Sequence, residues 1–202
     1  MTDQYVDPSV SRAKFARELR EFRAMEDTYR KRGWLLLKAR FPDVLVVLTA
    51  PQVTPPAVVT GVTLDYTNYD AAPPSVRLVD PFTLTPYRWS DLPLERQLLR
   101  AVGVGPQGVP GLPPGMVIQQ RQPLLVAHSP DDIPFLCIAG TREYHQHPAH
   151  SGDAWELHRQ AGAGRLVRIL EVIYTYGVAP INGFAVTLVP QVAGFSLGEV
   201  PA

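Results

Sequence analysis

The chain has 202 residues, of which 46% carry apolar side chains and 19% are charged. This composition excludes a disordered chain and is typical of a folded domain with a real core, so we expect a single domain over residues 1–202. Lys and Arg together number 19, as do Asp and Glu, so the net charge is zero. Without a strong global field, we expect neither nucleic acid nor an anionic membrane as a partner.

The chain contains one cysteine, Cys137, which excludes an internal disulfide and therefore the disulfide-stapled secreted class. The amino-terminal segment lacks the apolar stretch of a signal peptide, and we expect no membrane-spanning segment. A cytoplasmic location is the resulting expectation.

A first helix is predicted from Pro8 to Arg32, with Asp7 in the capping position and a proline in the first turn. Phe15, Leu19 and Phe22 recur at helical spacing and predict the face that packs on the rest of the fold. A glycine directly after this segment ends the pattern.

The other face of this helix is rich in arginine and lysine, including Arg17 and Arg20. Such a face is most often a solvated surface, and a docking surface for a partner is the alternative.

Short β-branched or apolar runs, separated by turn residues, follow the first helix. Because the connections between them are short, we predict an antiparallel meander, followed by a short helix, a long loop and a hairpin. The predicted elements are strands Trp34–Ala39, Val44–Leu48, Val58–Asp65 and Val76–Val79, helix Leu94–Val102, loop Gly103–Gly115, and hairpin strands Leu124–Ala127 and Phe135–Ile138.

The carboxyl-terminal part is predicted to be mainly helical. Asp153 and Glu156 have the spacing of a capping box and predict the start of a short helix. An amphipathic pattern over Leu166–Tyr174, closed by Gly177, predicts a longer one. Ala185–Val192 reads as a last strand, so the expected fold class is α+β.

All five histidines lie between positions 128 and 158, and four of them follow the single cysteine. In an extended segment Glu143, His145 and His147 would project to one side, with Cys137 entering from the strand before and His150 from the turn after. Thiolate, imidazole and carboxylate are all metal ligands, and a mixed set suits zinc best. The sequence therefore predicts a zinc site built from these five residues.

Two other interpretations of the same residues stay open. Cys137 and the histidines can be structural, which is the preferred interpretation for His128 and His158. Alternatively, a histidine within hydrogen-bond reach of Cys137 would lower the pKa of the thiol and give a nucleophilic thiolate.

Four stretches stand in this order along the chain: PPSVRLVD at Pro73–Asp80, FLCI at Phe135–Ile138, Trp155, and RLVRILEVI at Arg165–Ile173. Together with the predicted helix and meander, this order resembles the ubiquitin-conjugating enzyme fold. The resemblance implies an N-terminal helix, a four-stranded meander and C-terminal helices, with Cys137 at the position of the catalytic cysteine. The His-Pro-Asn motif of that family is not found between Asp80 and Cys137.

The stretch C-x5-E-x-H from Cys137 to His145 is similar to a second, bacterial family, a predicted metal-binding domain with a Cys, Glu, His, His signature that is associated with ubiquitin-like conjugation operons. This resemblance implies a component of a bacterial ubiquitin-like conjugation system, with or without catalytic activity. Its partner would be a ubiquitin-like protein or another conjugation component. The alternatives are a stand-alone zinc-dependent hydrolase and a scaffold that binds through the basic first helix.

Overall fold

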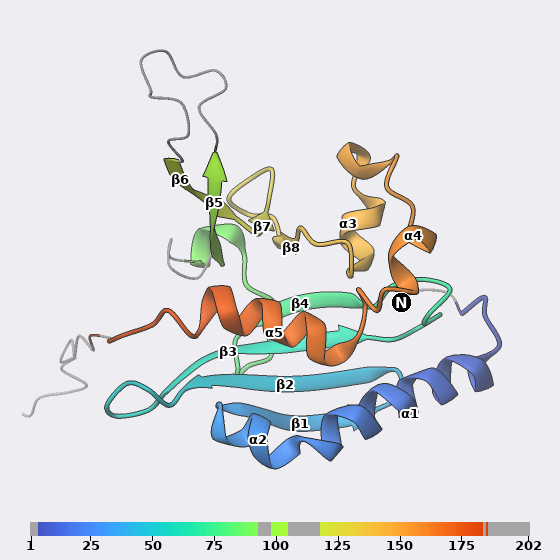
Figure 1. Cartoon of the computed structure of the whole chain (residues 1–202), viewed down its shortest axis with the longest axis horizontal. Helices are drawn as coiled ribbons and strands as arrows, with labels where there is room; N and C mark the ends of the chain where they lie inside the picture. Colours follow the sequence, from blue (N-terminus) through green and yellow to red (C-terminus); the bar gives the residue numbers. More distant parts are fainter. Residues whose placement is uncertain (1–3, 93–97, 105–117, 184, 186–202) are drawn as a thin grey trace, which may run out of the picture.

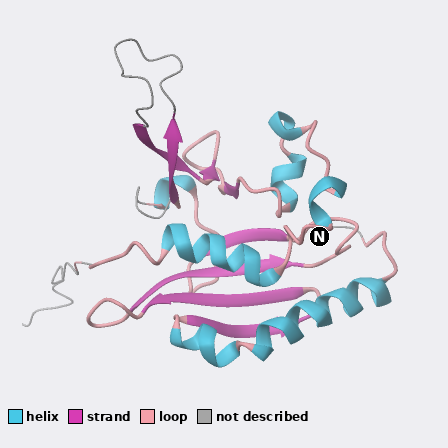
Figure 2. Ribbon diagram, viewed as in Figure 1, coloured by secondary structure: helices cyan, strands magenta, loops and turns pink. Residues whose placement is uncertain are grey.

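The computed structural model describes residues 4–92, 98–104, 118–183 and 185. Its centre is a four-stranded antiparallel sheet in the order β1-β2-β3-β4, as the meander prediction requires (Figures 1 and 2). The strands are β1 Trp34–Arg40, β2 Asp43–Ala50, β3 Ala57–Asp65 and β4 Ser75–Val79. Together with the helices before and after the sheet, this arrangement confirms the α+β class.

The predicted first helix is two helices, α1 Pro8–Ala24 and α2 Glu26–Lys31. Asp7 caps α1 as predicted, because its side chain accepts a hydrogen bond from the backbone N–H of Ser9 at 2.8 Å. Met25 separates the helices, with a non-helical φ of −120° and ψ of 13°. Past this break, the ring of Tyr29 stacks on Trp34 of β1 with 4.8 Å between centroids. Sequence periodicity continues through Met25 and did not reveal the break.

The core lies between the sheet and two helices, α1 and α5 Leu166–Gly177, which run along it (Figure 1). The predicted face of α1 is buried, and Phe22 is 0% exposed. The apolar face of α5 joins the same core, which confirms both amphipathic predictions. Among the described residues, no helix is both long enough and apolar enough to cross a membrane.

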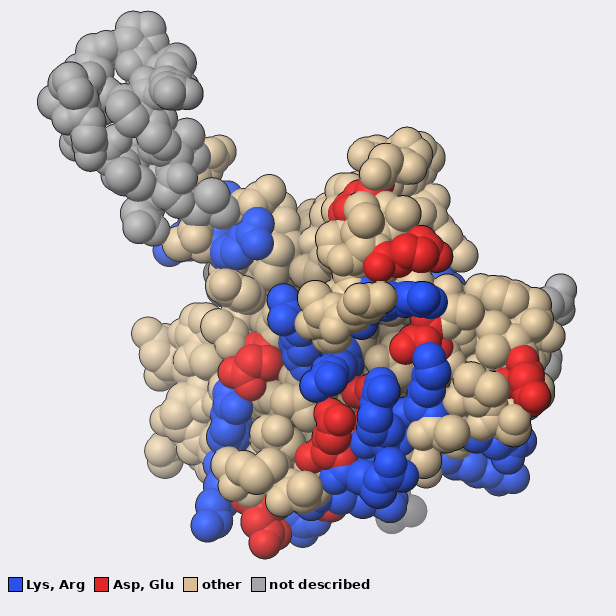
Figure 3. Space-filling view, turned by 45° about the vertical axis from the view of Figure 1, so that its right-hand side comes forward, with Lys and Arg blue, Asp and Glu red and all other residues tan. Residues whose placement is uncertain are grey.

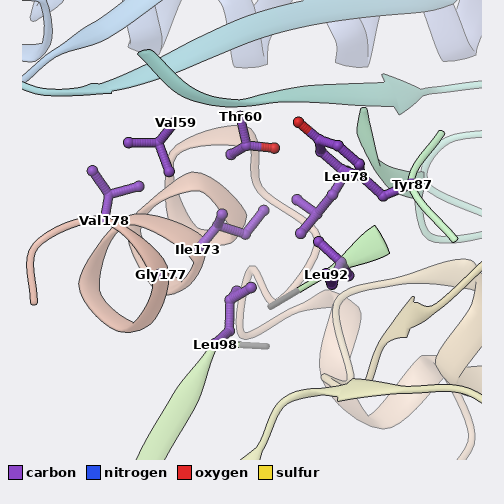
Figure 4. Close-up of a pocket in the computed structure, with 9 residues that line it drawn as sticks. All are labelled: Val59, Thr60, Leu78, Tyr87, Leu92, Leu98, Ile173, Gly177 and Val178. Atoms are coloured by element: carbon purple, nitrogen blue, oxygen red, sulfur yellow. The ribbon is translucent and has the colours of Figure 1, made fainter. Parts of the chain in front are cut away.

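A pocket between the sheet and α5 shows how tightly this core closes (Figure 4). Leu98, Ile173 and Gly177 line it from one side, and Val59 and Leu78 from the sheet. Its volume is about 10 Å³, which is at the lower limit for one water molecule. This space is a packing gap, too small for an organic ligand.

The basic residues of α1 are interleaved with acidic ones, and Figure 3 shows blue and red side chains mixed over one face of the molecule. Arg17 pairs with the buried Glu18 at 2.9 Å, and Arg165 lies 3.8 Å from Glu21. Arg20 is exposed. Part of the basic face is therefore occupied by contacts within the protein, and its use for docking stays a prediction.

Two small antiparallel sheets follow the large one. They pair β5 Leu99–Val104 with β6 Ile118–Pro123, and β7 Leu125–Val126 with β8 Phe135–Leu136. The second pair confirms the predicted hairpin in shortened form.

The helix predicted over Leu94–Val102 is wrong where it can be compared, because Leu99–Val102 belongs to β5. Residues 93–97 lie outside the described residues. Of the loop predicted over Gly103–Gly115, the first two residues belong to β5, and residues 105–115 lie outside the described residues. The error arises because β5 is stabilised by β6, a partner about twenty residues away that local propensity does not register.

Short helices connect β8 to α5: α3 Arg142–Gln146, the 3₁₀ turn η3 Pro148–His150, and α4 Glu156–Arg159. A short helix at Glu156 was predicted, but its capping box is wrong, since Trp155 is the capping residue and makes no side-chain cap bond. Asp153 instead contacts Tyr144 and His158. The predicted strand Ala185–Val192 lies outside the described residues except for Ala185, which is not in a strand.

Candidate functional site

Cys137 directly follows β8, as predicted from the hairpin. Its backbone N–H donates to the carbonyl oxygen of Leu124 at 2.7 Å, so the strand pairing holds the residue in place. The side chain is half-buried, and its Sγ lies 3.5 Å from Nε2 of His150. The predicted proximity of the cysteine to the histidines is therefore confirmed for His150.

The position of the His150 ring is fixed by Tyr144 of α3. The two rings stack with 3.8 Å between centroids and 21° between planes. The Tyr144 hydroxyl donates to Asp153 at 2.7 Å, and Asp153 also lies 2.5 Å from Nε2 of His158. These contacts form a continuous chain from the Cys137 thiol to His158.

Two pKa shifts describe this chain of contacts. The hydrogen bond to Asp153 raises the pKa of Tyr144 to about 12, so the tyrosine stays protonated and keeps donating at neutral pH. The hydrogen bond to His158, with that from Tyr144, lowers the pKa of Asp153, which stays ionised. A protonated Tyr144 and an ionised Asp153 both favour the hydrogen bond between them, which holds the Tyr144 ring against His150.

The surroundings of Cys137 favour the neutral thiol over the thiolate, which was one of the interpretations left open by the sequence. Burial raises the pKa of Cys137, and the positive charge of Arg100 opposes this shift only in part. The thiol needs a base to become a nucleophile, and His150 is within reach to act as one.

Glu143, His145 and His147 do not share one side of an extended segment, because residues 142–146 form α3. In a helix, side chains two positions apart point in different directions. Glu143 turns to β4, where it accepts hydrogen bonds from the Ser75 hydroxyl and, at 3.2 Å, from the Val76 N–H, and lies 3.3 Å from Arg77.

His145 and His147 are each engaged elsewhere. The ring nitrogens of His145 lie 2.8 Å from the backbone oxygens of Asp153 and Ala139. His147 pairs with His128, with 3.0 Å between their Nε2 atoms. Both residues therefore link backbone segments and loops around the site.

The predicted zinc ligands are divided between different contacts. Cys137 and His150 are close enough to share an ion, whereas Glu143 and His145 contact other partners. Within the described part of the chain, no three His, Cys, Asp or Glu side chains are grouped to hold a metal. The residues as placed do not form a four-ligand site, so we assign no chemistry to a metal, and zinc binding stays a prediction.

The sequence did not predict the role of Arg142, the residue that anchors this region to the sheet: a pairing with a carboxylate such as Asp153 was considered, and the carboxylate it contacts is that of Asp65. Its side chain is buried and donates to the backbone oxygens of Pro73 at 3.2 Å and Thr67 at 2.7 Å, and it lies 3.2 Å from a carboxylate oxygen of Asp65. An arginine beside a run of histidines carries no local signal of burial. Only the sheet contact identifies its role.

The fold and site define an α+β protein in which a thiol–imidazole pair lies beyond a four-stranded meander. Residues 6–181 match the model of the Y4jH-like family, described as the Y4jH family. The chain is also 45% identical over 198 residues to a protein of Sinorhizobium fredii printed as "Uncharacterized protein y4jH", covering 95% of this chain and 93% of that protein. The chain therefore belongs to the Y4jH-like family. The matched region contains every element from α1 to α5.

Proposed function

We propose that this protein is a component of a bacterial ubiquitin-like conjugation system, in which Cys137 carries an acyl group as a thioester. The observation that carries the proposal is the contact of 3.5 Å between Sγ of Cys137 and Nε2 of His150. A thiol paired with an imidazole at the end of a strand can attack a carbonyl once the proton is removed.

The order of elements supports the resemblance to ubiquitin-conjugating enzymes. A helix, a four-stranded meander, the cysteine and a last amphipathic helix follow in the expected sequence. The PPSV stretch at Pro73–Val76 leads into β4. It contacts α3 through hydrogen bonds with the side chains of Arg142 and Glu143. The residues that suggested the resemblance thus help position the cysteine region.

The proposed step is a transfer between two thiols. As the Cys137 sulfur attacks the carbonyl carbon of a donor thioester, His150 takes the thiol proton. A new carbon–sulfur bond forms, the bond to the donor sulfur breaks, and the proton passes to that leaving sulfur. No oxidant or reductant is needed. Because the His-Pro-Asn motif is absent from the expected interval, we extend the proposal no further than this carrier step.

Transfer from the thioester of a short peptide ending in glycine tests this step, with intact-protein mass spectrometry as readout. We expect a hydroxylamine-sensitive adduct on the wild type and none on Cys137→Ala. His150→Gln should slow transfer about a hundredfold, which is the usual contribution of a general base. His128→Gln, a change of another histidine that does not contact the thiol, should leave the rate unchanged. Equal rates for His150→Gln and the wild type would contradict the proposed role of His150.

A further inference from the structure

A second pocket lies between residues 138–140, the loop that follows Cys137, and the helices α4 and α5. Its volume is about 290 Å³, far larger than the packing gap shown in Figure 4. An apolar cavity of roughly 150 Å³ suffices for benzene, so this pocket has room for a ring with a polar substituent. Such a size is near the lower end for small-molecule sites.

The lining of this pocket combines positive charge with apolar surface. Arg100 of β5 and Arg168 of α5 contribute guanidinium groups, whereas Ile138 and Val172 contribute aliphatic side chains. Tyr176 adds a ring with a hydroxyl group. No Asp or Glu is among the described residues that line the pocket.

The two arginines have positive charge available for a ligand. Arg100 donates to the side-chain oxygen of Gln122 at 2.9 Å, a neutral partner. In the part of the chain that the structure describes, neither Arg100 nor Arg168 lies within 4.0 Å of a carboxylate oxygen. By contrast, Arg32 and Arg142 are each paired with an acidic residue. A guanidinium group is well suited to bind a carboxylate or a phosphate.

We infer that this pocket binds a small organic anion, a carboxylate or phosphate monoester with an apolar body, through Arg168 and Arg100. The anionic group contacts the guanidinium groups, and the apolar part packs on Ile138 and Val172. Ile138 directly follows Cys137 in the chain, so the bound molecule lies close to the loop that holds the thiol. This inference does not depend on the carrier function of the cysteine.

Protein-observed NMR titrations with benzoate, phenyl phosphate and the neutral analogue benzamide test the inference, at concentrations up to about 10 mM. We expect the two anions to shift the resonances of Ile138 and Val172, with binding weakened as salt rises from about 50 to about 500 mM. Arg168→Gln should weaken binding at least about tenfold, which corresponds to one lost charged contact. Arg20→Gln removes the same charge from an exposed site on α1 and should leave binding unchanged.

The titrations also distinguish carboxylates from phosphate esters, and they can contradict the inference. Tighter binding of benzoate assigns the pocket to carboxylates, and tighter binding of phenyl phosphate assigns it to phosphate esters. Equal binding of benzamide, an unchanged affinity in Arg168→Gln, or no binding of either anion would overturn the inference. Inorganic phosphate that binds as tightly as phenyl phosphate would overturn the role of the apolar surface. Because Arg168 is exposed, the substituted protein is expected to fold normally.

Discussion

The helix layer, α1 and α5 on the sheet, and the histidine segment, residues 142–159, are held by different forces. The helix layer has helices of 17 and 12 residues that bury apolar faces in one core. The helices of the histidine segment have five and four residues, too short to be stable alone. They depend on hydrogen bonds that Arg142 and Tyr144 donate and that Glu143 accepts. Apolar burial builds the framework, and side-chain hydrogen bonds place the candidate site on it.

The strongest test of this contrast is Phe22→Ala in the helix layer. Phe22 is 0% exposed, so truncation leaves a cavity in the core. We expect a loss of about 3–5 kcal/mol in the free energy of unfolding, measured by urea denaturation. A change at the exposed Arg20, to alanine, is the control and should cost little. An unchanged denaturation midpoint for Phe22→Ala would show that this face does not form the core.

In the histidine segment, Arg142→Gln should have the next largest effect. Removing the guanidinium leaves buried backbone oxygens at Pro73 and Thr67 without their donor. The expected cost is about 1–3 kcal/mol for unsatisfied buried groups, and the matched change Arg159→Gln on the exposed face of α4 should be close to neutral. Equal stabilities of the two variants would show that Arg142 is not an anchor.

The contrast also explains how much of the fold the sequence predicted. The four strands and both amphipathic helices were predicted because their periodicity is local and long enough to read. The pairing of β5 with β6 depends on residues about twenty positions apart, and the predicted helix there was wrong. The hydrogen bonds that fold residues 142–146 into α3 come from β4 and its preceding loop, which no local pattern contains.

For the candidate site, sequence proximity predicted part of the result. Cys137 and His150 come together, since the strand end and the following turns bring the chain back. Glu143 diverges because the segment is helical, and its carboxylate turns to Ser75 and Arg77 instead. Tyr144 was not considered, although it is the ring that positions His150.

A smaller effect is expected from the pH dependence of the histidine segment. The pKa of Asp153 is lowered in the folded protein, so its ionised form favours folding. This contribution is complete above the unfolded carboxyl pKa of about 3.9 and is lost as the pH falls through the lower folded value. Melting temperatures of the wild type and Asp153→Asn should therefore differ at pH 7 and converge in acid. A constant difference down to about pH 2 would contradict the shift.

The reactivity of the Cys137 thiol should also depend on pH. Because burial raises the pKa of the thiol, alkylation by iodoacetamide should rise with pH through a midpoint above that of a free cysteine, about 8.5. Arg100→Gln removes the charge that opposes this shift and should move the midpoint higher. A midpoint below that of free cysteine would mean that the resting group is a thiolate.

The smallest effect is expected from metal removal. Since Glu143 and His145 are engaged by other partners, we expect less than about a tenth of an equivalent of zinc in protein purified without an affinity tag, and no change in melting temperature with chelator. Stoichiometric zinc that stabilises the protein would instead support the predicted ligand set and require α3 to rearrange.

Trapping with Cys137→Ser in the native host tests the central claim most directly. A serine at this position converts a transient thioester into a more stable oxygen ester, so a carried polypeptide should remain attached. The account predicts that mass spectrometry finds a base-labile adduct of a whole polypeptide on residue 137, lost in Cys137→Ala. Recovery of Cys137→Ser with no polypeptide attached, under conditions where the protein's partners are expressed, would contradict the carrier function.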